Sequence, residues 1–303
     1  MGEIMSKYMK VGIVHFMAYP STGGGEGPIV ETIQKIAEDD YFDAIEISWI
    51  KDINKRKEVK KILEISKLKI TYVAHPRLLS TGLNINDCRN NDREKALKTL
   101  KDGIDEAYEL GAESFAYLSG KYKEKNLDEA FEALLKSTKE LCSYAGEKGS
   151  MNVLLEIFDH KIDKKSLIGP TDLALKLAEE VEKEFNNFGL IVDLSHIPLI
   201  GEAIRESIIP IKKYIKQFHI GNSVVKDPSL EGYGDNHPRF GFPNSENDED
   251  EVVEFLKVLK EIGYLNSTEQ KVVSFEVKPW KNEKPELVIS NAKRTLNRAW
   301  SRI

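Results

Sequence analysis

Single polar residues interrupt four apolar stretches in the second half of the chain. Glu156 lies in "VLLEIF", Asp193 ends "GLIVD", His219 lies in "KQFHIG" and Glu276 lies in "VVSFEV". Burying one ionised carboxylate without a partner is costly, and burying three together is worse because like charges repel. A divalent cation resolves the conflict because it attracts all three carboxylates at once. This oxygen-rich set predicts one divalent metal, first Mn²⁺, with Mg²⁺, Co²⁺ or Zn²⁺ as the alternatives.

Histidines follow the same pattern. Each lies at the end of an expected strand or in the loop just after it: His15, His75, His160, His196, His219 and His237. A random distribution would also place histidines in the expected helices. Their positions therefore predict one functional rim. The alternative for the acidic residues is a set of ion pairs with lysine or arginine, such as Lys278.

The elements that must position these residues alternate between short apolar stretches and amphipathic stretches of helical period. The eight expected strands are residues 10–16, 42–48, 69–75, 112–118, 152–158, 189–195, 216–222 and 271–277. Alternating strands and helices require a parallel sheet, and eight such units close a (β/α)8 barrel. A doubly wound open sheet is the alternative. We therefore expect an α/β fold, a single TIM-barrel domain over residues 1–303, with residues 1–8 flexible.

One expected connection is unusually long. Residues 223–248 show no periodic pattern and are rich in Gly, Pro, Asn and Asp. Loops of this length inside a compact domain are usually functional. This one follows the seventh strand, so it should lie at the carboxyl face of the barrel, where barrel enzymes keep their active sites. We expect it to be an active-site loop.

Composition restricts the class of protein. Lys and Arg total 44 against 50 Asp and Glu, a net charge of -6, which argues against nonspecific nucleic-acid binding. No apolar stretch is long enough for a membrane span, and the first ten residues lack the apolar core of a signal peptide. The two cysteines, Cys88 and Cys142, are far apart, so no disulfide framework is expected. These features favour a cytoplasmic location.

The ordered set of polar residues resembles a known family. Glu on the fifth strand, Asp-x-x-His on the sixth, His on the seventh and Glu on the eighth resemble the xylose-isomerase-like barrel superfamily. The sugar-phosphate isomerase/epimerase group is most similar in pattern. The resemblance implies a metal-dependent isomerase or epimerase of a sugar, sugar acid or cyclitol. It also implies Glu156, Asp193, His219 and Glu276 as metal ligands, and Glu156 and Glu276 as an acid/base pair acting through an enediolate.

Substrate contacts are expected around the same rim. The resemblance implies that His196 contacts a substrate hydroxyl and that Arg239, in the long loop, holds an oxygen or a phosphate. Trp49 and Trp280 are expected to stack on a sugar ring, or else to seal the barrel mouth. The other candidates are His75 and His237. The expected partner is a small carbohydrate, and a homo-oligomer is left open.

Alternatives remain open at this point. A lyase or dehydratase would use the same proton abstraction if a leaving group lay β to the carbonyl. A metal-dependent phosphodiesterase resembling the apurinic-site endonucleases would need three zinc ions, but the chain lacks their histidine after the fourth strand. A second metal near His75, Asp235 and His237 is a further alternative. A non-catalytic sugar-binding barrel is the last.

Overall fold

The apolar stretches predicted as strands form one parallel sheet in the computed structural model, which describes residues 4–303. Within this range the strands are β1 Met9–Ile13, β2 Ala44–Ile47, β3 Lys69–Val73, β4 Ser114–Leu118, β5 Asn152–Glu156, β6 Phe188–Asp193, β7 Ile215–Gly221 and β8 Lys271–Glu276. The longer helices are α2 Ile29–Ala37, α3 Ile53–Ser66, α5 Asn90–Glu109, α6 Leu127–Lys148, α7 Thr171–Glu182, α10 Glu249–Glu261 and α11 Pro285–Trp300. Short helices are α1 His15–Ala18, α4 His75–Leu79, α8 His196–Ile200 and α9 Ile204–Ile208.

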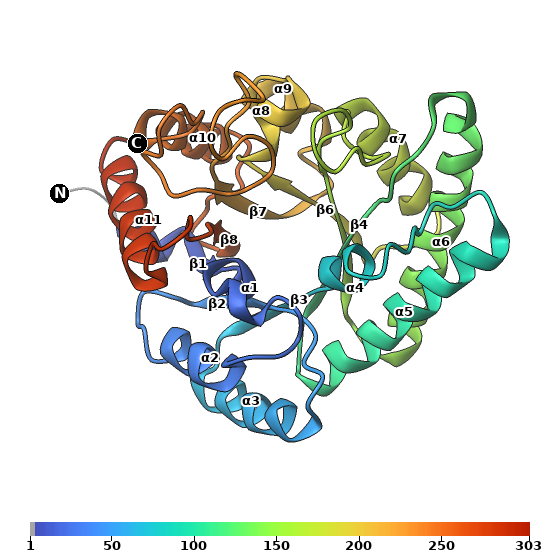
Figure 1. Cartoon of the computed structure of the whole chain (residues 1–303), viewed down its shortest axis with the longest axis horizontal. Coiled ribbons are helices and arrows are strands. Elements are labelled where there is room, and N and C mark those ends of the chain that lie inside the picture. The colour runs from blue at the N-terminus through green and yellow to red at the C-terminus, as the bar shows by residue number, and fades with distance from the viewer. Residues whose placement is uncertain (1–3) are drawn as a thin grey trace.

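The sheet curls until its two ends meet. Its strand order is β1-β8-β7-β6-β5-β4-β3-β2, with parallel pairing throughout. The remaining gap is bridged where the Asp43 amide donates to the Val11 carbonyl and where Val14 pairs with Glu46. Figure 1 shows the helices arranged outside the strands, with α11 beside β1. The predicted (β/α)8 barrel is confirmed, and the open doubly wound sheet is excluded.

The alternation of side chains along each strand decides which residues enter the barrel. Val73, Ala116, Leu154 and Ile191 form a small apolar cluster inside it. The residue two positions further along a strand lies on the same face. Glu156 therefore follows Leu154 into the interior, and Asp193 follows Ile191. The larger apolar core lies between the strands and the outer helices.

The other half of the interior is polar. Glu46, Gln217 and Ser274 are completely or almost completely buried there, on β2, β7 and β8. Thr71 on β3 donates a hydrogen bond of 3.0 Å to the Gln217 side chain across the barrel. Gly12 on β1 leaves room for this layer, because a Cβ atom on it would lie 2.3 Å from Ser274 Oγ.

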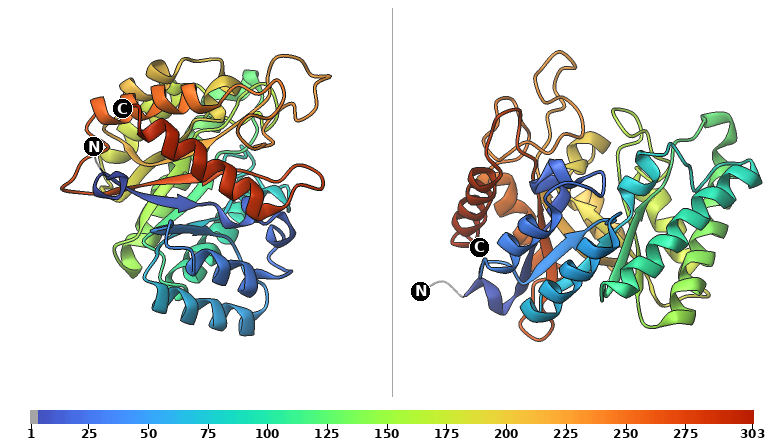
Figure 2. Two further views of the ribbon diagram at one scale, coloured as in Figure 1. Left: turned by 90° about the vertical axis from the view of Figure 1, so that its left-hand side faces the viewer. Right: turned by 60° about the horizontal axis from the view of Figure 1, so that its bottom comes forward.

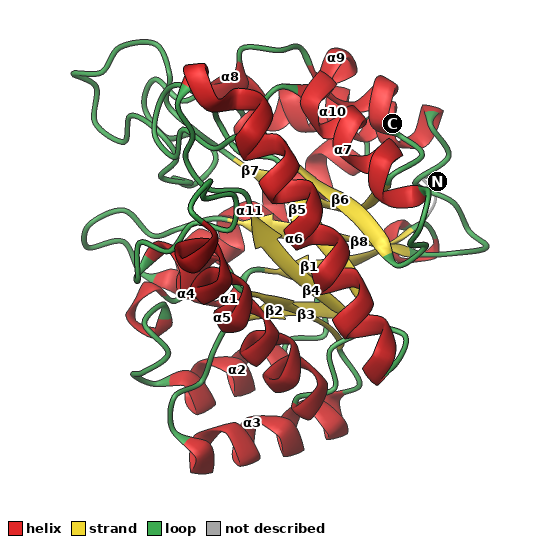
Figure 3. Ribbon diagram, turned by 90° about the vertical axis from the view of Figure 1, so that its right-hand side faces the viewer, coloured by secondary structure: helices red, strands yellow, loops and turns green. Residues whose placement is uncertain are grey.

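The loops after the strands gather at one side of the molecule, as Figure 3 shows in green. Residues 222–248 connect β7 to α10 within the described range and contain no helix or strand. This loop projects beyond the helices in Figure 2, where it is orange. Its base is anchored by Asn247, whose side-chain amide donates to the carbonyls of Leu194 and Gly221. The long connection predicted from the sequence is therefore present on the carboxyl face.

The amino-terminal segment is described only from residue 4. Met5–Lys7 form a 3-10 turn, and the Tyr8 ring lies 5.7 Å from the Trp300 ring. Residues 1–3 lie outside the described residues, so the predicted flexibility of residues 1–8 stays a prediction. Among residues 4–303, no helix combines the length and apolar character that crossing a membrane requires.

Gly12→Ala is expected to lower the free energy of unfolding by about 1–3 kcal/mol, because the added methyl group collides inside a closed interior. Urea unfolding followed by circular dichroism measures the change. Adding Ser274→Gly should recover part of the loss, since it removes the colliding hydroxyl. Gly24→Ala is the control, because a Cβ atom there has no neighbour within 4 Å. Equal stability of Gly12→Ala and Gly24→Ala would contradict this account of the interior.

Candidate metal centre

Four strand ends bring their polar residues to one point. Glu156, Asp193, His219 and Glu276 lie on β5, β6, β7 and β8, and one ligand atom from each lies within 4.8 Å of the others. All four side chains are buried, with Glu276 the most exposed at 5%. The carboxyl ends of consecutive parallel strands meet at the same rim, so the four side chains converge.

The hydrogen bonding of these side chains tests whether they fit a metal. Within the described part of the chain, both Glu156 oxygens, Asp193 Oδ2, His219 Nδ1 and Glu276 Oε2 are buried without a hydrogen bond. Nearly all buried polar atoms in proteins have a partner. His219 Nδ1 lies 2.7 Å from Glu276 Oε2 and 3.4 Å from Glu156 Oε1. Lone pairs that converge in this way fit a divalent cation with oxygen and imidazole ligands.

The charges around the point favour a cation as well. The buried carboxylates nearby belong to Glu46, Glu156, Asp193, Asp235 and Glu276. Burial lowers the pKa of His196, but Asp235 and Asp193 outweigh it and raise the pKa to about 10. Burial likewise opposes the charged form of His237, yet Asp235 and Glu276 raise its pKa to about 9. The carboxylates thus draw positive charge into the site, which a divalent cation would supply directly.

The two glutamates differ in environment. Burial raises the pKa of Glu156 to about 7, although His219 opposes this shift. Burial also disfavours the ionised form of Glu276, but His237 and His219 outweigh it and lower the pKa of that carboxyl group. Paired carboxyl groups whose pKa values are pushed apart are typical of acid/base sites.

Glu46 contacts the candidate metal centre, although the sequence analysis did not identify it. It is completely buried on β2, and its Oε2 accepts a hydrogen bond of 3.2 Å from His219 Nε2. A carboxylate that accepts from Nε2–H fixes the imidazole so that the Nδ1 lone pair faces the metal ligands. The signal was present, because Glu46 is a single acidic residue within the apolar stretch "AIEI".

A second polar group adjoins the first. His196 Nε2 and His237 Nε2 lie 3.1 Å and 2.7 Å from the same Asp235 oxygen. His196 Nδ1 donates to the Ile157 carbonyl at 2.8 Å, so its Nε2 faces the site. Lys164 Nζ lies 2.7 Å from the other Asp235 oxygen. His237 has a φ of 48°, and strained backbone of this kind concentrates at functional sites.

The structure does not bring together the residues expected to hold a second metal. His75 lies beside Glu156 instead, with its Nε2 3.5 Å from Glu156 Oε2. His196 instead joins Asp193 and His237 in a compact set of ligand atoms. His15, His75 and His196 are also the first residues of the short helices α1, α4 and α8, rather than strand-end or loop residues as expected.

Other candidates lie outside the cluster. Arg239 Nε donates to Glu283 at 2.8 Å, and its Nη1 donates to the Gly241 carbonyl. Trp280 Nε1 donates to Glu231, and the Trp49 ring lies under the Lys51 ammonium at 4.9 Å. Each of these side chains contacts its own rim neighbours. The substrate contacts expected for Arg239, Trp49 and Trp280 stay predictions.

Two histidines also lie apart. His15 Nε2 lies 2.8 Å from Thr32 Oγ1 on helix α2. His15 lies beyond the end of β1, as the first residue of helix α1, and its ring pairs with α2 rather than with the metal centre. His160 is only partly buried, in the loop after β5. The six histidines therefore do not form one cluster.

Comparison with known proteins gives one family and a set of similar folds. The family model for the xylose isomerase-like TIM barrel matches residues 33–296. No curated protein sequence gives a significant match. A D-tagatose 3-epimerase-like protein has a TM-score of 0.71 at 20% identity, covering 97% of this chain and 99% of that chain.

Two further solved structures are similar. The IolI protein with a bound zinc atom has a TM-score of 0.72 at 18% identity, covering 97% of this chain and 99% of that chain. The 3-keto-D-glucoside 4-epimerase YcjR from E. coli has a TM-score of 0.66 at 16% identity, covering 95% and 99%. At these identities the likeness shows the fold alone.

Glu46→Gln is expected to weaken metal binding by about 10- to 100-fold, because it removes the charge that orients His219 and raises its basicity. Titration of the metal-free protein with Mn²⁺ against a competing chelator measures the affinity. Glu113→Gln is the control, since the Glu113 side chain is 61% exposed at the opposite end of the barrel. An unchanged affinity in Glu46→Gln would remove Glu46 from the site.

Proposed function

Because the chain belongs to the xylose isomerase-like TIM barrel family, we propose that it is a divalent-metal-dependent isomerase or epimerase of a sugar, sugar acid or cyclitol. The observation that carries the proposal is the convergence of buried, unbonded ligand atoms on Glu156, Asp193, His219 and Glu276. The similar folds of a D-tagatose 3-epimerase-like protein and of a 3-keto-D-glucoside 4-epimerase add support.

The proposed chemistry rests on two opposed glutamates. Glu156 on β5 and Glu276 on β8 lie three strands apart around the barrel, so their carboxyl groups approach from different sides. A divalent cation held by Glu156, Asp193, His219 and Glu276 would supply Lewis acidity toward a carbonyl oxygen. One glutamate removes the proton from the carbon beside the carbonyl, and the C–H electrons give an enediolate. The other returns a proton, to the opposite face in an epimerase or to the neighbouring carbon in an isomerase.

The second polar group would orient the substrate. His196, Asp235 and His237 line one side of the centre with fixed hydrogen-bonding directions, since the Ile157 carbonyl holds His196 and Lys164 holds Asp235. Hydroxyl groups of a carbohydrate both donate and accept, so this wall can bind two neighbouring hydroxyls. Such positioning keeps the reacting C–H bond in line with a glutamate.

A metal-dependent phosphodiesterase is the second candidate, favoured by the compact set of Asp193, His196 and His237, which could hold another cation. A site with three zinc ions has less support, because β4 offers no ligand. Tyr117 Oη pairs with Thr138 on helix α6 at 2.6 Å. Ser119 Oγ accepts from the Ile168 amide at 2.8 Å.

A lyase would use the same two glutamates on a substrate with a leaving group.

Solvent exchange tests the proton transfer. In D2O with Mn²⁺, the protein should incorporate deuterium beside the carbonyl of at least one compound in a panel of ketoses and inososes, as measured by NMR. Glu156→Gln and Glu276→Gln should each slow this exchange by about 100- to 10,000-fold, because each removes an acid/base group. Glu113→Gln should exchange at the wild-type rate. Exchange that persists in both glutamine variants would refute the proposed roles.

The number of bound metal ions separates the candidates. One Mn²⁺, Co²⁺ or Mg²⁺ per chain, lost in Asp193→Ala, supports the isomerase or epimerase. Elemental analysis of the protein after metal loading and gel filtration gives the count. Two or more Zn²⁺ per chain, one of them lost in His237→Ala, would favour the phosphodiesterase. No metal under any loading condition would leave the four residues as an ion-pair network.

A further inference from the structure

A pocket of about 610 Å³ lies between the loops that follow β3, β4 and β5. Its apolar wall consists of leucines: Leu78, Leu79, Leu83 and Leu118. We call it the leucine pocket. No residue that the sequence predicted for the site lines it.

The leucine pocket adjoins the metal centre at three places. Leu118 is the ladder partner of Glu156 on the next strand, and neighbouring strands lie about 5 Å apart. Leu118 also points inward, because it lies two positions beyond the inward Ala116. Helix α4 begins at His75, beside Glu156, and ends at Leu79, about 6 Å further along its axis. A substrate bound at the centre therefore has the pocket within reach of its next group.

The loop between β5 and α7 makes the third connection. Lys164 lines the leucine pocket, and its ammonium group lies 2.7 Å from Asp235 in the polar wall of the site. The same lysine therefore separates the two compartments. One side offers hydrogen-bonding groups, and the other offers leucine side chains.

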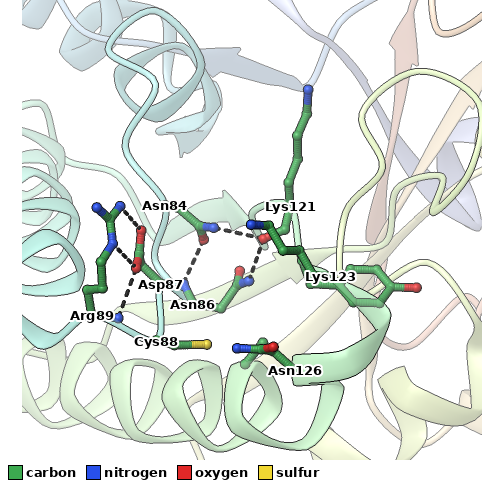
Figure 4. A pocket seen from close by; sticks show the side chains of 10 residues that line it. Asn84, Asn86, Asp87, Cys88, Arg89, Lys121, Lys123 and Asn126 are labelled. Atoms are coloured by element: carbon green, nitrogen blue, oxygen red, sulfur yellow. Dashed lines mark hydrogen bonds and ion pairs between the residues drawn. The ribbon is translucent and has the colours of Figure 1, made fainter.

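The polar atoms around the pocket are already used to build it. Asn84 and Asn86 both donate to the Lys121 carbonyl, at 2.8 Å and 3.1 Å. Figure 4 shows these bonds in a neighbouring pocket that shares Asn84, Asp87 and Lys121 with the leucine pocket. The Ser119 hydroxyl accepts from the Ile168 amide, and Asp87 pairs with Arg89. These groups have little capacity left for sugar hydroxyls. The leucine pocket can therefore contribute to ligand binding mainly by burying apolar surface.

Leu79 shows why an apolar occupant is favoured. Its side chain is 51% exposed although it lines a pocket, so a ligand there would remove apolar surface from water.

Lys121 is the exception among the polar groups, since among residues 4–303 its ammonium group has no hydrogen bond or ion pair. Figure 4 shows this side chain extending away from the amides of Asn84 and Asn86.

We propose that the leucine pocket binds an apolar aglycone, so that the substrate is an alkyl or aryl glycoside of a keto sugar rather than a small free sugar. The inference rests on the proposed function and deepens it. The sugar ring occupies the metal centre and its polar wall, and the aglycone lies against Leu78, Leu79 and Leu83.

The test compares ligands that share a sugar and differ only in the aglycone. The probes are the 4-nitrophenyl and methyl forms of β-D-glucoside, α-D-glucoside and β-D-galactoside, titrated into Mn²⁺-loaded protein by calorimetry. In at least one pair the aryl glycoside should bind about 10- to 100-fold more tightly, as expected for burying an aromatic ring. Equal affinity within every pair, or no binding of any probe, would overturn the inference.

Substitutions in the leucine pocket test whether its leucines cause the tighter binding of aryl glycosides. Leu79→Ser and Leu83→Ser should each reduce the aryl advantage by about tenfold, whereas Leu79→Met should retain it. Leu287→Ser is the control, because Leu287 is 65% exposed on α11, outside the pocket. An aryl preference that survives both pocket variants comes from elsewhere and overturns the inference.

The same variants distinguish the aglycone from two other possible occupants of the leucine pocket. Sedimentation that changes in Leu79→Ser but not in Leu287→Ser would assign the leucines to contact with a second copy. Tight binding of glucose 6-phosphate that Lys121→Gln abolishes, without any aryl preference, would assign the pocket to an anionic group. Either result overturns the inference. The deuterium-exchange assay tests the proposed function independently of this inference. It reports on proton transfer by Glu156 and Glu276, and the leucines do not take part in that step.

Discussion

Mutual repulsion among buried carboxylates at the mouth of the barrel is the constraint on which this structure depends. Glu156, Asp193 and Glu276 could not stay ionised together without a cation, because burial removes the water that would screen them. The histidines and Lys164 supply part of the compensation in the protein alone. A divalent ion would supply it more completely, at the point where the unbonded lone pairs meet.

The rest of the barrel holds these groups in place. Glu46 fixes His219 from the opposite side of the interior, and the Ile157 carbonyl fixes His196. The loop after β5 is shaped by Asp159, whose buried carboxylate accepts from the backbone amides of residues 161–165. That loop carries Lys164 to Asp235. Preorganised support of this kind keeps catalytic groups within the narrow range of positions that proton transfer requires.

The mouth of the barrel divides into compartments of different polarity. One contains the proposed metal ligands and the wall formed by His196, Asp235 and His237, and the leucine pocket lies beside it. A substrate with a polar reacting end and an apolar far end would match both. Binding energy from the far end could then be used to orient the reacting carbons.

The amino-acid sequence by itself determined the barrel, and it predicted the four polar residues that converge at its mouth. Strand and helix periods are local, and a lone polar residue at the end of an apolar stretch indicates the ligand set without any knowledge of distant contacts. Tertiary structure decided what depends on contacts between distant segments. Glu46 contacts His219, which is 173 residues away in the sequence. Arg239, in the loop after β7, pairs with Glu283, in the loop after β8. Tertiary structure also places His196, not His75, beside His237. Such contacts depend on how loops and opposite strands pack against one another, and short-range sequence patterns do not predict that packing.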